Sequence, residues 1–249
     1  MDKLFIFDLD DTLIHTDYKY IRGYAEAICF ITNFLGKRAI HLDRLLGYIH
    51  KIDEDAIKHS DKPYSIERFP KSICYAFGLI CQEQGVQYKQ RDLDNLAEIV
   101  TKATFNVLPQ DTNGGAYETL EFLVSRHDKL ALLTKGEKNF QMSKIEICGL
   151  NRWFSEEDIF VSEVDKSPSL LLSIIKKYDI TNKDKAYSVG NYFRSDIKPA
   201  FEAGIKSIYI PNGGWRYDAN TEGIEEALNS GRVLILKRID EIIKRYEEL

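Results

Sequence analysis

Short runs of apolar residues recur along the chain and predict β-strands that are buried on both faces. The first run, Leu4-Phe5-Ile6-Phe7, has the unbroken apolar character that is typical of an inner strand in a parallel sheet. Further runs predict strands over residues 130–133, 159–161, 186–189 and 208–210, and residues 233–236 predict an edge strand.

From the second apolar run onward, helical patterns separate the predicted strands. Expected helices begin near Gly115 and after Pro168, cover residues 139–148 and 196–203, and close the chain as an amphipathic segment over 239–249. Gly149 and Gly204 stand where C-terminal helix caps are expected. Strands and helices that alternate in this way predict an α/β fold, with a Rossmann-like parallel sheet and right-handed crossovers.

The stretch between the first two strands has a different pattern. It shows helical periodicity without convincing strands, over residues 20–35, 42–52, 66–84 and 92–105. About ninety residues are too many for a simple connection. We therefore predict a helical domain over residues 16–107, inserted into a core domain made of residues 1–15 and 108–249.

Composition narrows the functional classes. Hydrophobic residues make up 44% of the chain and charged residues 29%, as in ordinary globular proteins. The net charge is −5 and no block of like charge occurs, which argues against a nucleic-acid partner. No apolar run approaches membrane-spanning length, and the first strand starts too early to leave room for a signal peptide. The four cysteines form no close pair, so we expect reduced thiols and a cytoplasmic protein.

The richest chemistry follows the first strand, in Asp8-Leu9-Asp10-Asp11-Thr12-Leu13. Asp8 and Asp10 are two residues apart, so an extended backbone would place them on one side. Two acids held close together repel each other and tend to recruit a divalent cation. A calcium loop of the EF-hand type is excluded, because the required Gly and acid are replaced by Leu13 and Lys19. A solvated acidic turn remains open for this segment taken alone.

Polar residues also follow the other predicted strands. Thr134 comes directly after residues 130–133, with Lys135 and Gly136 next, where a hydroxyl and backbone amides could bind an anion. Lys166 precedes the Pro168 helix and could offset the charge of a phosphoryl group and of the acids. Each has an ordinary alternative, because Thr134 could be a turn residue and either lysine a surface residue.

The last of these strands is followed by Gly190-Asn191-Tyr192-Phe193-Arg194-Ser195-Asp196. Asp196 offers another acidic ligand, although it could also cap a helix start. An amide oxygen such as that of Asn191 can bind Mg²⁺ without contributing charge. Because ligands gather at the carboxyl ends of strands in an open parallel sheet, we expect all these side chains to converge.

The chain resembles the haloacid dehalogenase (HAD) superfamily in four places. Asp8-x-Asp10-x-Thr12 after a strand is similar to its first motif, Thr134 to its second and Lys166 to its third. The fourth motif usually reads Gly-Asp before a second Asp, and here Asn191 replaces the first acid. The resemblance covers nearly the whole chain except the helical insertion, which would be a cap domain that excludes water and contacts the leaving group. Trp215 and Arg216 could line the entrance or only pack a loop.

The resemblance implies a Mg²⁺-dependent phosphatase acting on a small phosphorylated metabolite. Asp8 would be the nucleophile and Asp10 the general acid and base, while Thr134, Lys135 and Lys166 would bind the phosphoryl group. Asp8, the Asp10 backbone carbonyl and Asp196 would hold the metal, with Asn191 as a ligand or a neighbour of one. Superfamily dehalogenases lack the second acid, so Asp10 favours phosphate esters.

Two alternatives remain at this point. A phosphomutase would share the nucleophile and the acid but return the phosphate to its substrate. A non-catalytic binding protein on the same scaffold is favoured only by Asn191. The natural substrate, the cap residues that would set specificity and the oligomeric state cannot be read from the sequence.

Overall fold

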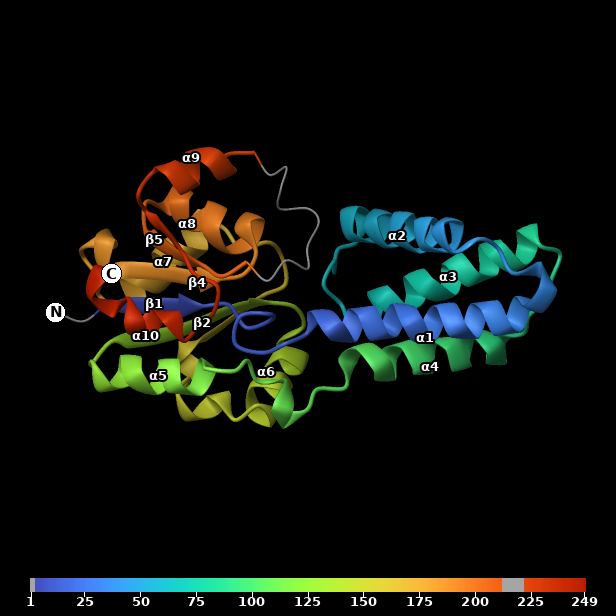
Figure 1. Ribbon diagram of the computed structural model, residues 1–249, viewed down its shortest axis with the longest axis horizontal. Helices are drawn as coiled ribbons and strands as arrows, with labels where there is room; N and C mark the ends of the chain where they lie inside the picture. Colours follow the sequence, from blue (N-terminus) through green and yellow to red (C-terminus); the bar gives the residue numbers. More distant parts are fainter. Residues whose placement is uncertain (1–2, 212–221) are drawn as a thin grey trace. The chain divides into compact units, whose positions relative to one another are not determined.

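A parallel β-sheet forms the centre of the larger part of the chain (Figure 1). The computed structural model describes residues 3–211 and 222–249, and within them the sheet has six strands in the order β3-β2-β1-β4-β5-β6. The strands are β1 (Leu4–Phe7), β2 (Lys129–Lys135), β3 (Ile159–Ser162), β4 (Ala186–Gly190), β5 (Lys206–Tyr209) and β6 (Val233–Ile235). Every neighbouring pair is parallel, so the predicted α/β fold class is confirmed.

The first strand is central in the sheet because both of its faces are apolar. Leu4 pairs with Lys129 of β2 on one side and with Ala186 of β4 on the other. Leu4 and Ile6 face one hydrophobic cluster, whereas Phe5 and Phe7 face the opposite side, where Phe5 stacks on a tyrosine of β4. A strand with two buried faces is thus fixed in register, which fixes the position of the residues that follow it.

Helices cover both faces of the sheet (Figure 1). Those of this part are α5 (Ala116–Ser125), α6 (Lys138–Ile147), α7 (Pro168–Lys177), α8 (Lys198–Ala203), α9 (Ile224–Asn229) and α10 (Glu241–Lys244). Helices α7 and α8 contribute Leu171, Ile174 and Ala200 to the cluster on the Leu4 face. Short 3₁₀ turns cover Pro109–Asp111, Leu150–Arg152, Glu156–Asp158, Lys183–Lys185 and Tyr246–Glu248, and one π-helical turn covers Phe193–Ile197.

The chain divides into two compact units, residues 1–16 with 108–249, and residues 17–107. The second unit is helical and contains α1 (Asp17–Leu35), α2 (Leu42–His59), α3 (Arg68–Glu83) and α4 (Gln90–Phe105), with a 3₁₀ turn at Gly36–Arg38. It has a hydrophobic core of its own, in which Ile31, Ile73 and Phe77 have no exposed surface. Each unit therefore buries a separate hydrophobic core.

The two chain segments that leave and re-enter the first unit run next to each other. The His15 amide donates to the Asp111 carbonyl at 2.7 Å, and the Asn113 amide donates to the Leu13 carbonyl at 2.8 Å. Ile14 and Thr112 form an antiparallel bridge between these bonds. The insertion thus begins and ends at neighbouring points of the sheet-containing unit.

Several sequence expectations differ from the structure. Strand β2 continues through Thr134 and Lys135, because both pair with β3, so these residues end the strand instead of following it. The closing helix over 239–249 is only α10 and a 3₁₀ turn. The helix expected over 196–203 begins only at Lys198, and Asp196 lies within the π-helical turn before it.

Trp215 and Arg216 lie outside the described residues. Among the helices of the described part, none is both long and apolar enough to cross a membrane.

Candidate active site

The sheet order reverses direction between β1 and β4, which makes the carboxyl ends of these two strands the expected place for a ligand. Asp8 follows β1 directly, and its amide donates to the Val189 carbonyl of β4 at 2.8 Å. This bond extends the ladder by one residue beyond the strand. It therefore holds the backbone of Asp8 at the topological switch point.

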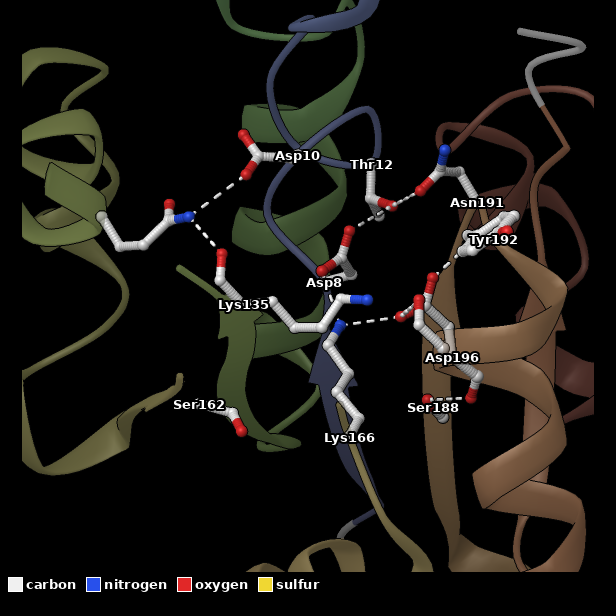
Figure 2. Close-up of polar contacts among 12 residues, drawn as sticks. Asp8, Asp10, Thr12, Lys135, Ser162, Lys166, Ser188, Asn191, Tyr192 and Asp196 are labelled. Atoms are coloured by element: carbon white, nitrogen blue, oxygen red, sulfur yellow. Dashed lines mark hydrogen bonds and ion pairs between the residues drawn. The ribbon is translucent and has the colours of Figure 1, made fainter. Parts of the chain in front are cut away.

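Three charged side chains meet there (Figure 2). Lys166 Nζ lies 2.6 Å from Asp8 Oδ1 and 2.7 Å from Asp196 Oδ1. The Lys166 side chain is only 4% exposed and that of Asp196 only 1%. One ammonium thus joins two carboxylates that come from opposite sides of the switch point, in a region from which water is largely excluded.

Burial sets the proton affinities of this cluster. Burial raises the pKa of the Asp8 carboxyl, Lys166 opposes that shift, and Asp196 reinforces it. For Lys166, burial lowers the pKa, but the charges of Asp196 and Asp8 outweigh burial and raise the pKa to about 12. Lys166 is therefore cationic at neutral pH and supplies a fixed positive charge beside Asp8.

Asp196 is held in place by its own turn. Its Oδ1 also accepts a hydrogen bond from Ser195 Oγ at 3.2 Å, and its Oδ2 accepts one from the Tyr192 amide at 3.0 Å. Ser188 Oγ donates to the Asp196 backbone carbonyl at 2.9 Å, tying the turn to β4. A Cβ on Gly190 would lie 2.4 Å from the Asp196 carboxyl carbon, so only glycine lets this carboxylate fold over the strand end.

Thr134 lies at the end of β2, and its hydroxyl has no hydrogen-bond partner among the residues that the structure describes. The residue is 1% exposed, and its Oγ1 is buried without a hydrogen bond. An unpaired buried hydroxyl is unfavourable unless a ligand or water satisfies it. Its neighbour Lys135 forms an ion pair with Asp165 at 3.2 Å, at a partly exposed position.

Thr12 connects the first motif to the fourth. Its Oγ1 lies 3.4 Å from Asp8 Oδ2 and 3.5 Å from Asn191 Oδ1 (Figure 2). Both contacts are long, and one hydroxyl proton can serve only one acceptor at a time. Asn191 is buried, and its amide oxygen faces the same small group of oxygen atoms as Asp8.

Asp10 has partners that the sequence did not reveal. Lys144 Nζ lies 2.6 and 2.7 Å from its two carboxylate oxygens, and Gln141 Nε2 donates to Oδ2 at 3.3 Å. In Figure 2 the Asp10 carboxylate points away from that of Asp8, although a shared side was expected. The chain leaves extended geometry just after this residue, where Asp11 has a φ of 58°.

A signal for the two partners does exist in the sequence. Gln141, Lys144, Ile145 and Cys148 share one helical face and are all buried. Two long polar side chains on the core-facing side of a helix imply a buried polar partner, because unpaired burial would be costly. Gln141 and Lys144 lie within a helix and belong to none of the strand-end motifs.

Comparisons with known proteins identify the family of the chain. Residues 3–204 match the family model described as haloacid dehalogenase-like hydrolase. The chain belongs to this family. The superfamily predicted from the four motifs is therefore confirmed. No functionally curated protein matches the sequence significantly.

Solved structures of other haloacid dehalogenase-like proteins share the fold. A family hydrolase from Xanthomonas campestris is 20% identical, with a TM-score of 0.70, over 99% of this chain and 91% of that one. A 2-haloacid dehalogenase from Pseudomonas syringae pv. tomato is 18% identical, with a TM-score of 0.58, over 100% and 99%. The HAD-hydrolase YfnB from Bacillus subtilis, bound to magnesium, is 15% identical, with a TM-score of 0.60, over 98% and 97%. At these identities the likeness concerns the fold alone.

The donor set of this hydrolase fits a hard divalent cation. Within residues 3–211 and 222–249, no three His, Cys, Asp or Glu side chains gather as a metal site. The oxygen donors that these contacts bring near one another are the carboxylates of Asp8 and Asp196 and the amide oxygen of Asn191. All are oxygens, as Mg²⁺ prefers, and two carboxylates against one ammonium leave a negative charge for a cation to neutralise.

Proposed function

We propose that this hydrolase is a Mg²⁺-dependent phosphatase that cleaves small phosphorylated metabolites through an aspartyl-phosphate. The observation that carries the proposal is the buried group in which Lys166 joins Asp8 to Asp196. A nucleophilic carboxylate beside a fixed cation suits attack on an anionic phosphorus centre, because the cation offsets the charge of the incoming phosphate.

Thr134 and Lys166 are suited to binding the transferred group. The buried, unpartnered Oγ1 of Thr134 can donate to a phosphate oxygen without breaking any bond within the protein. The Lys166 ammonium can donate to a second oxygen while it keeps one carboxylate partner. These two donors would hold phosphorus in line with Asp8.

Asp10 is suited to proton transfer. In the first step Asp8 attacks phosphorus, and Asp10 gives a proton to the oxygen of the departing alcohol. In the second step Asp10 takes a proton from the water that cleaves the aspartyl-phosphate, which restores both carboxyl groups. Mg²⁺ bound by Asp8, Asp196 and the Asp10 carbonyl, with or next to Asn191, would neutralise charge on the phosphate oxygens.

Asp10 also supports a phosphatase over a dehalogenase. Expulsion of a halide requires no proton, whereas an alkoxide is a poor leaving group until it is protonated. A similar fold occurs in a 2-haloacid dehalogenase, so substrate class must be decided by experiment.

The test is a substrate panel assayed with the purified full-length protein. We expect release of inorganic phosphate from p-nitrophenyl phosphate and from some phosphorylated metabolites, dependent on added Mg²⁺ and lost with a chelator. Release of halide from 2-haloacids, or isomerisation of a sugar phosphate without phosphate release, would reject the proposal. No turnover by a demonstrably folded protein would instead favour a binding protein.

The same panel is assayed with Asp8→Asn, a variant that lacks the proposed nucleophile. It should lower turnover by at least about 10³-fold, as removal of a nucleophile does in other enzymes, while circular dichroism stays unchanged. Activity close to that of the wild type would remove Asp8 as the nucleophile.

A further inference from the structure

Helix α6 contributes two buried polar side chains to the candidate active site, and neither belongs to the motifs described above. Gln141 and Lys144 are one helical turn apart, so both point to the same side of α6. The Lys144 side chain is 5% exposed, whereas that of Asp10 is 31% exposed. Both side chains donate hydrogen bonds to the Asp10 carboxylate, although they lie more than 130 residues away from it in the sequence.

The Lys144 contact has the geometry of a strong, directed ion pair. Its ammonium lies within 2.7 Å of both carboxylate oxygens, so rotation of the carboxylate about its own axis is restrained. Burial of Lys144 without a hydrogen-bond acceptor would be costly, and the Asp10 carboxyl oxygens supply that acceptor.

Gln141 adds a second restraint and ties it to the end of β2. Its Nε2 donates both to Asp10 Oδ2 and to the Lys135 backbone carbonyl. The next residue, Gly136, has a φ of 139°, and a Cβ there would lie 2.5 Å from this same nitrogen. The glycine after β2 thus makes room for Gln141, which in turn contacts Asp10.

In-line attack places the leaving-group oxygen across phosphorus from Asp8, so Asp10 need not face Asp8 to reach that oxygen. We propose that Lys144 and Gln141 are positioning residues that hold the Asp10 side chain in the orientation from which it transfers a proton to that oxygen. The inference rests on the proposed phosphatase function, since it assigns Asp10 the proton transfer. We call the pair the Asp10 clamp. Asp10 is partly exposed and follows a strand that ends at Phe7, so its own backbone does not fix the carboxylate.

Leaving-group dependence distinguishes this role from a merely structural one. Nitrophenolate departs readily without a proton, whereas the alkoxide of an alkyl phosphate such as glycerol 2-phosphate requires one. The ratio kcat/KM depends only on the steps up to formation of the aspartyl-phosphate. It therefore does not depend on the later step in which water cleaves that intermediate. Loss of the clamp should therefore affect kcat/KM for the alkyl ester selectively.

The experiment compares Lys144→Met with wild type on both esters at saturating Mg²⁺. We expect kcat/KM for glycerol 2-phosphate to fall about 10- to 100-fold, while that for p-nitrophenyl phosphate changes by less than about threefold. Lys138→Met, an exposed lysine on the same helix, is the control and should change neither. Equal losses on both esters, or no loss on either in a folded variant, would overturn the proposal.

A second measurement does not depend on turnover. Urea unfolding of Lys144→Met, Asp10→Asn and the double variant should show non-additive effects, with a coupling of at least about threefold in the unfolding equilibrium constant. If the wild type hydrolyses no phosphate ester, the proposed function is wrong, but the unfolding measurement still tests the clamp. Additive effects of the two substitutions on the unfolding equilibrium would overturn the clamp as well. Should Lys144→Met not fold, Gln141→Met removes the weaker contact and takes its place in both measurements.

Discussion

At the scale of single residues, Asn191 is where this site departs from the family motif. Its amide oxygen faces Thr12 Oγ1 at 3.5 Å, in the group of oxygens that includes Asp8. A neutral ligand attracts a divalent cation less strongly than a carboxylate does. The remaining charge on the site comes from Asp8 and Asp196, and Lys166 already neutralises part of it.

This arrangement predicts that Asn191→Asp tightens Mg²⁺ binding. The added charge should lower the dissociation constant by about tenfold, because metal affinity follows the charge of the ligands. Isothermal titration calorimetry with MgCl₂ measures the change directly. Asn139→Asp, which adds the same charge at an exposed position of α6, should bind Mg²⁺ as wild type does. An unchanged constant for Asn191→Asp would place this side chain away from the ion.

The sequence could predict that Asp8, Lys166 and Asp196 lie together, because each follows a strand with a readable apolar pattern. The structure brings these three together. The sequence could not show that Asp10 faces Lys144, since that contact depends on the tertiary packing of α6. A pair 134 residues apart has no local signal other than a polar residue on a buried helix face.

At the scale of elements, strand positions were more predictable than strand ends. The β1 run was identified without error, whereas β2 extends two residues beyond its apolar segment. Pairing with β3 extends it, and a ladder partner is a tertiary property that local sequence does not contain. The closing helix is similarly shorter than its amphipathic pattern, because packing and not periodicity sets helix ends.

The junction of β4 and the π-helical turn gives a prediction at this scale. In Gly190→Ala the new methyl group would overlap the Asp196 carboxyl, so the turn must shift. We expect a loss of about 1–3 kcal/mol in the free energy of unfolding, as for other overpacked sites, together with weaker Mg²⁺ binding. Urea unfolding and calorimetry measure the two effects.

Gly114→Ala is the matched control for this variant. An added Cβ at Gly114 meets no atom within 4 Å, so its stability and metal binding should equal those of wild type. If Gly190→Ala behaved in the same way as this control, close packing of Asp196 on the strand end would be wrong.

At the scale of the whole molecule, the chain consists of two units with separate cores. The sequence indicated this division through a change from alternating strands and helices to helices alone. The role of the insertion as a cap that contacts the substrate stays a prediction. The chemistry proposed here uses side chains of the sheet-containing unit only.

We predict that the sheet-containing unit folds without the insertion. Replacing residues 17–107 with a short Gly-Ser linker should leave a single cooperative unfolding transition, because the backbone segments on either side are already hydrogen-bonded to each other. Circular dichroism and urea unfolding test this expectation. A molten or aggregated product would show that the core of this unit depends on residues 17–107.

The bridge between Ile14 and Thr112 has an evolutionary consequence. If the sheet-containing unit folds without residues 17–107, as predicted above, this bridge closes the junction whatever polypeptide lies between its two sides. Mutation, lengthening or exchange of that intervening segment can therefore accumulate without displacing the nucleophile. Descendants of one ancestral gene could diversify what they recognise while inheriting the same reaction.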